Sequence, residues 1–103
     1  MMRVLVADDD ENSRVLLRAA LEARGYTVDD AADGAQALKL AQQEQPDLIV
    51  SDIMMPEMDG FAFCAAVKND THLNKIPFGV VSSVIRFIRL PGKRWTSASR
   101  IRC

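Results

Sequence analysis

Four oxygen-bearing side chains stand at positions from which they could act together: Asp8, Asp9, Asp52 and Ser82. Each lies at or just beyond the end of a short apolar run, the pattern of a buried strand in a parallel sheet. Ligands bind beyond the carboxyl ends of such strands, so we expect these side chains to converge at one edge of the sheet. Three carboxylates that close repel one another, and a hard divalent cation, Mg²⁺ or Mn²⁺, is the usual remedy.

Such a cluster suits phosphoryl transfer. A magnesium ion held by a few carboxylates keeps waters that phosphate oxygens can replace. A carboxylate at the centre of the cluster can itself be the nucleophile, as in aspartyl-phosphate chemistry. A serine hydroxyl can then hydrogen-bond a phosphoryl oxygen. The residue types therefore point to phosphoryl transfer at this edge.

The elements that must position these residues alternate along the chain. Continuous apolar runs predict buried strands, and the amphipathic stretches between them predict helices. Strands separated by helices of about ten residues form a parallel sheet with right-handed crossovers, so the fold class is α/β with a doubly wound parallel sheet. A cap at Asn12 or Ser13 begins the first helix, which runs to about Arg24, and Gly25 stops it. The other expected helices are 35–43 and 61–69, and the expected strands are 4–7, 26–31, 48–50 and 78–81.

Length and composition predict one globular domain. The chain has 103 residues, of which 49% are hydrophobic and 26% charged, as in ordinary folded proteins. No signal peptide is visible, and no apolar stretch approaches the roughly 18 residues of a membrane-spanning helix. We therefore expect a cytoplasmic protein with no membrane partner.

Three segments, in this order, resemble the receiver domain of response regulators in two-component signalling. They are VLVADDD at 4–10, PDLIVSDIMMPEMDG at 46–60 and IPFGVVSS at 76–83. The resemblance covers residues 3–83, and the segment around Asp52 is its most specific part. It implies a flavodoxin-like fold with strand order 2-1-3-4-5, and a phosphoacceptor module of a phosphorelay rather than an enzyme.

The resemblance also implies a role for each site residue. Asp52 corresponds to the phosphoacceptor, and Asp8 and Asp9 to the acidic pair that binds Mg²⁺ together with Asp52. The backbone carbonyl of Met54 corresponds to a further metal ligand, and Ser82 to the hydroxyl that contacts the phosphoryl group. The implied donors are a sensor histidine kinase or a phosphotransfer protein.

The last twenty residues are a different kind of sequence. All 14 acidic residues precede residue 84, whereas residues 84–103 hold six basic residues and no acid. We therefore divide the chain into a receiver-like core, 1–83, and an atypical basic segment, 84–103, of the same domain. The family places a lysine about twenty residues past the hydroxyl residue, but Lys93 comes much too early after Ser82. We expect strand five and helix five to be incomplete or altered, as after a frameshift or in a truncated gene.

An altered ending would leave the fourth strand as a sheet edge that invites a second copy to form a homodimer. Residues 84–90 could instead dock there as a substitute strand or form a short helix, and the sequence leaves both open. The basic segment contains Trp95 but no recognisable reading helix, so nucleic acid is not an expected partner.

Other interpretations of the same residues remain open. The acidic run at 8–11 also fits a solvated loop or the start of a helix, and Ser82 also fits a turn residue with Ser83 as its rival. A receiver-like interaction module that is truncated and no longer switched is one alternative function. A haloacid-dehalogenase-like phosphohydrolase using Asp8 and Asp10 is a more remote one, which leaves the motif around Asp52 unexplained.

Overall fold

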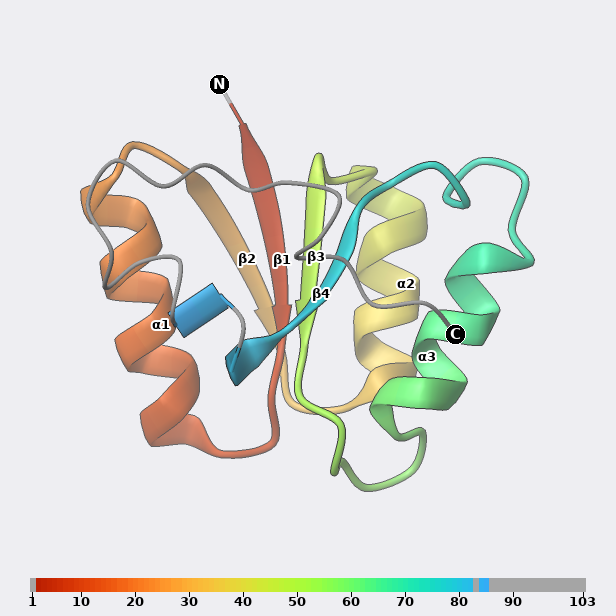
Figure 1. Cartoon of the computed structure of the whole chain (residues 1–103), viewed down its shortest axis with the longest axis horizontal. Coiled ribbons are helices and arrows are strands. Elements are labelled where there is room, and N and C mark those ends of the chain that lie inside the picture. Colours follow the sequence, from red (N-terminus) through yellow and green to blue (C-terminus); the bar gives the residue numbers. More distant parts are fainter. Residues whose placement is uncertain (1, 83, 86–103) are drawn as a thin grey trace.

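The computed structural model describes residues 2–82, 84 and 85. Strands and helices alternate along this part of the chain, as the sequence predicts (Figure 1). The elements are β1 (Arg3–Ala7), α1 (Glu11–Ala23), β2 (Thr27–Ala31), α2 (Gly34–Glu44), β3 (Leu48–Ser51), α3 (Gly60–Lys68) and β4 (Phe78–Val80).

The four strands form one parallel sheet in the order β2-β1-β3-β4. The chain therefore runs outward from β1 to β2, crosses back over β1 to β3, and continues to β4. This reversal next to β1 is the topological switch point of a doubly wound sheet, beyond which such folds place their ligands. The α/β fold class is confirmed, and so is the order of the strands that the structure describes.

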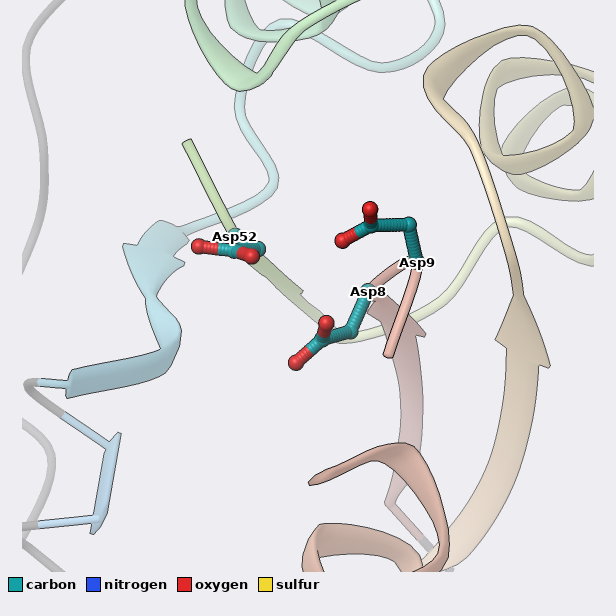
Figure 2. Close-up of side chains that lie close together, drawn as sticks. All are labelled: Asp8, Asp9 and Asp52. Carbon is teal, nitrogen blue, oxygen red and sulfur yellow. The ribbon is translucent and has the colours of Figure 1, made fainter. Parts of the chain in front are cut away.

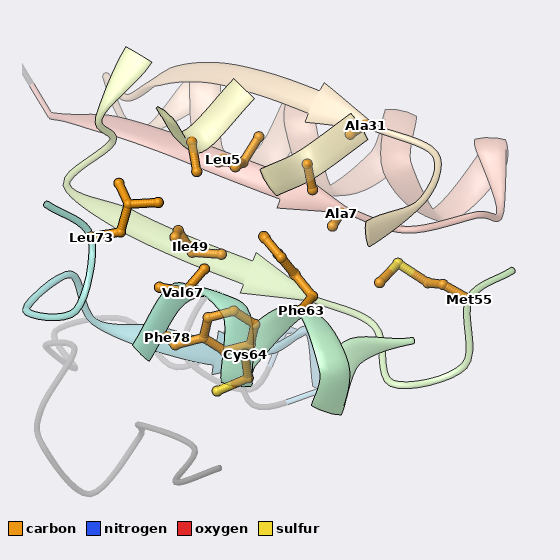
Figure 3. Packing of buried hydrophobic residues seen from close by; sticks show 12 residues of the cluster. Leu5, Ala7, Ala31, Ile49, Met55, Phe63, Cys64, Val67, Leu73 and Phe78 are labelled. Carbon is orange, nitrogen blue, oxygen red and sulfur yellow. The ribbon is translucent and has the colours of Figure 1, made fainter. Parts of the chain in front are cut away.

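Helices cover both faces of the sheet. On one face α1 packs Leu17 and Leu21 against the buried valines of β1 and β3. On the other face α2 and α3 cover a larger cluster, in which the rings of Phe63 and Phe78 lie 5.2 Å apart in an edge-to-face arrangement (Figure 3). Both faces of β1 and β3 are therefore buried, which explains why their sequences are continuously apolar rather than alternating.

The first helix begins earlier than the sequence analysis expected. Its cap is Asp10, not Asn12 or Ser13, because the Asp10 carboxylate accepts hydrogen bonds from the Asn12 amide and the Ser13 hydroxyl. The end of the helix is as expected, with Gly25 at a left-handed φ of 91°. In the acidic run, Asp10 therefore caps the helix, whereas Asp8 and Asp9 precede the cap and do not belong to the helix.

The fourth strand ends one residue early, at Val80, and residues 81, 82, 84 and 85 are helical. Val84 is buried in the cluster beneath α1, so the chain turns back onto the domain after β4. The expectations for the basic segment from residue 86 onward lie outside the described residues. Among those residues β4 pairs only with β3, and a homodimer through its other edge remains a prediction.

Candidate functional site

Three carboxylates meet at the carboxyl end of the sheet. Asp8 and Asp9 follow β1, and Asp52 follows β3, the strand that pairs with β1. Each of the three offers a carboxylate oxygen, and these oxygens lie within 4.8 Å of one another (Figure 2). The parallel pairing of β1 with β3 is what brings together residues that stand 44 positions apart in the sequence.

The three carboxylates differ in their exposure to solvent. Asp8 is buried, Asp52 is half-buried and Asp9 is exposed. Burial raises the pKa of the Asp8 carboxyl, and the negative charges of Asp52, Asp9 and Asp10 raise it further, while a hydrogen bond from the Asp10 amide opposes the shift. The site therefore holds a carboxylate whose negative charge the fold disfavours, and a divalent cation would compensate it.

Two backbone contacts orient Asp52. Its amide donates to the Ala7 carbonyl of β1 at 2.8 Å, which extends the ladder of hydrogen bonds past the end of β3. Its Oδ1 accepts a hydrogen bond from the Ile53 amide at 2.8 Å. One carboxylate oxygen is thus held by the protein.

A cavity of about 290 Å³ opens over these residues. Its wall includes Asp8 and Asp52, Val80 and Val81 from the end of β4, and Ser82 in the helical turn that follows. None of the described residues that line it is basic. The cavity is therefore negatively charged, so a cation is the ligand that it accepts most readily.

The sequence-predicted residues are thus placed unevenly. Asp8, Asp9 and Asp52 come together, and Ser82 lines the same cavity from a helical turn rather than from a strand end. Met54 lies two residues past Asp52 in the loop to α3, and the residue is 78% exposed. Ser83 lies outside the described residues.

Sequence reasoning missed three polar contributions to this site. Asp10 and Ser13 line the cavity as well as capping α1. The third is Ser51, a buried serine that immediately precedes Asp52. A polar residue at the end of the apolar run 48–50 was the available signal.

The loop between β3 and α3 contains a strained turn. The Met58 amide donates to the Pro56 carbonyl at 2.7 Å, closing a three-residue turn around Glu57, whose φ is 67°. A positive φ is unfavourable for a residue with a side chain, and such strain often lies near functional sites. Gly34, at the start of α2, abuts this loop so closely that a Cβ there would collide with the Met58 carbonyl oxygen.

Comparison with known proteins agrees with this geometry. The sequence model of the response regulator receiver domain matches residues 4–86. The chain belongs to that family. It is a signalling domain of the two-component type rather than a classical enzyme, so the phosphohydrolase alternative is set aside.

Individual relatives support the same assignment. Over 82 residues, 80% of this chain, the sequence is 43% identical to the response regulator PleD of Caulobacter vibrioides, of which the match covers 18%. Over 66 residues, 64% of this chain, it is 47% identical to the transcriptional regulatory protein PhoP of Bacillus subtilis, of which the match covers 28%. The chain thus spans only about a fifth to a third of the length of these two relatives.

Solved structures give the same fold. The chemotaxis response regulator CheY4 of Vibrio cholerae superposes with a TM-score of 0.75 at 39% identity, over 78% of this chain and 67% of that one. The receiver domain of the Pseudomonas aeruginosa sensor histidine kinase PA1611 superposes with a TM-score of 0.74 at 25% identity, over 77% of this chain and 65% of that one. The PA1611 structure holds a magnesium ion in its active-site cleft. No helix among the described residues of the present chain is long and apolar enough to cross a membrane.

Proposed function

We propose that this receiver domain accepts a phosphoryl group on Asp52 from a histidine kinase or phosphotransfer protein in the cytoplasm. The observation that carries the proposal is the meeting of Asp8, Asp9 and Asp52 within 4.8 Å at the switch point of the sheet. Asp52 is the central candidate because it lines the cavity and is half-buried, whereas Asp8 is buried, and because the Ile53 amide holds one of its carboxylate oxygens.

The proposed step is an in-line displacement at phosphorus. The Asp52 oxygen that is not bonded to Ile53 forms a bond to the phosphorus of a phosphohistidine, and the phosphorus–nitrogen bond breaks. The electron pair leaves with the imidazole nitrogen, which then takes a proton. The Ser82 hydroxyl lines the cavity and would donate a hydrogen bond to a phosphoryl oxygen.

The donor set fits Mg²⁺ or Mn²⁺. We assign the metal to the carboxylates of Asp8, Asp9 and Asp52 and to the backbone carbonyl of Met54, all oxygen ligands of the kind that hard cations prefer. When bound, the ion would neutralise charge on the transferred group. The buried Asp8 supports this assignment, because its pKa is raised by burial and by neighbouring acids that a cation would offset.

The proposal is tested by incubating the chain with Mg²⁺ and acetyl phosphate and mapping the modified residue by mass spectrometry. We expect one label, on Asp52, that Asp52→Asn abolishes and that omission of the metal suppresses. Asp47→Asn serves as the control. Asp47 lies next to the opposite end of β3, away from the carboxylate cluster, where its carboxylate accepts a hydrogen bond from the Arg3 amide. Labelling that maps to Asp8, or that persists in Asp52→Asn, would overturn the proposal.

A further inference from the structure

Ser51 is a buried polar residue at the end of β3. Ser51 is 1% exposed, and among the described residues Asp8 is the only other polar or charged residue that is buried. It lies in register with Ala7 of β1 and Val80 of β4, so sheet neighbours flank it on both sides. A hydroxyl that loses water in this way must find a partner inside the protein.

The partner is the backbone of the next residue. The Ser51 Oγ donates to the carbonyl oxygen of Asp52 at 2.7 Å. The same peptide unit, between Asp52 and Ile53, is bonded at its other end, because the Ile53 amide donates to Asp52 Oδ1 at 2.8 Å. A peptide unit is planar, so the direction of its carbonyl determines the direction of its N–H.

The carbonyl is also confined from the side of α3. Gly60, the first residue of that helix, lies so close that a Cβ there would collide with the Asp52 carbonyl oxygen. The Gly60 amide in turn donates to the Ile53 carbonyl at 2.8 Å. The carbonyl of Asp52 is therefore bonded by the Ser51 hydroxyl and packed against Gly60, a position where a side chain would collide with it.

We propose that Ser51 is a positioning residue, which holds the Asp52–Ile53 peptide unit and through its N–H fixes the orientation of the Asp52 carboxylate. This inference rests on the proposed function in one respect, the role of Asp52 as the nucleophile. Holding Oδ1 with Ile53 leaves the other oxygen presented to the phosphoryl donor in one orientation. Correct orientation before reaction is worth a large factor in rate, and small displacements lose much of it.

Ser51→Ala tests the inference by removing the hydroxyl and leaving the carbonyl. We expect amide exchange at Ile53 to become at least about tenfold faster, and labelling of Asp52 by acetyl phosphate to slow by about tenfold. Ser51→Thr keeps a hydroxyl at the same position and should restore both quantities. Val28→Ala removes buried side-chain volume from β2, far along the sheet from Asp52, and serves as the control for a general loss of stability.

The two measurements separate the two proposals. If the unaltered protein is not labelled on Asp52, the proposed function fails, but Ile53 exchange still tests the positioning. If Ile53 exchange and the labelling rate are both unchanged in Ser51→Ala, the positioning inference fails while the function stands. The inference is also overturned if Val28→Ala slows the labelling of Asp52 as much as Ser51→Ala does, or if Ser51→Thr is labelled as slowly as Ser51→Ala. Either result would assign the effect to packing.

Discussion

The carboxylate cluster costs the free domain stability, and Asp8→Asn should show how much. The buried Asp8 faces the charges of Asp52 and Asp9, whose oxygens lie within 4.8 Å. Asparagine removes one negative charge and keeps an oxygen that can accept the hydrogen bond that the Asp10 amide now donates to Asp8 at 2.9 Å. The substitution therefore removes repulsion with little change in shape.

The size of the effect follows from the distances. At 4.8 Å two unit charges repel by roughly 0.9 kcal/mol in water and roughly 3.5 kcal/mol at an effective dielectric constant of about 20. Asp8 takes part in two such pairs, and because Asp9 is exposed and Asp52 half-buried, we take a repulsion near the lower figure for each pair. We expect Asp8→Asn to raise the free energy of unfolding by about 2 kcal/mol, or the Tm by about 10 °C, without divalent metal.

The gain should depend on pH. The pKa of Asp8 is raised in the folded protein, mainly by burial, so the folded state binds a proton more tightly than the unfolded state. The free energy of unfolding of the unaltered protein therefore falls as the pH rises from the ordinary aspartate pKa through the raised one. The advantage of Asp8→Asn should vanish below the ordinary pKa, where Asp8 is protonated in both states, and be complete above the raised one.

Thermal and urea unfolding with a metal chelator provide the measurement, repeated with excess Mg²⁺. Metal binding to the folded state should stabilise the unaltered protein, so the difference in free energy of unfolding between it and Asp8→Asn should become smaller. Asp70→Asn is the matched control, because it also removes one charge and keeps an acceptor for the His72 amide, outside the cluster. An Asp8→Asn variant no more stable than Asp70→Asn at neutral pH would refute the reasoning.

Three further predictions address the metal, the acceptor loop and the core. In calorimetric titration Asp9→Asn should weaken Mg²⁺ binding sharply, and Asp10→Asn, which keeps the helix cap, should weaken it much less, because Asp10 lines the cavity but is not an assigned ligand. Equal losses would mean that the metal pair is misassigned. Glu57→Gly should raise the free energy of unfolding by about 1 kcal/mol, because glycine tolerates the φ of 67°, whereas an equal gain from Glu57→Ala would show that charge, not strain, is responsible. Phe63→Ala, at a fully buried position that contacts Phe78, should cost about 3–5 kcal/mol in urea unfolding; a loss below about 1.5 kcal/mol would contradict the packing described.

The sequence by itself determined the alternation of strands and helices and the position of the three carboxylates at strand ends. Both depend on signals that are local in the chain. The apolar run before Asp8 and Asp9 and the apolar run before Asp52 mark buried strands without reference to any other segment. Once the strands are parallel, their carboxyl ends share an edge, so the convergence of the aspartates follows.

Only the tertiary structure decided the details that depend on what packs nearby. Several residues near the start of α1 are equally good caps by type, and Asp10 rather than Asn12 is the cap because the folded helix begins at Glu11. In the sequence Ser51 resembles any serine in a strand. Only the structure shows that its hydroxyl bonds the Asp52 carbonyl and that Gly60, from the next helix, packs against the same carbonyl. These contacts join residues whose relation is spatial, so the sequence names the candidates and the packing of β3 against α3 selects among them.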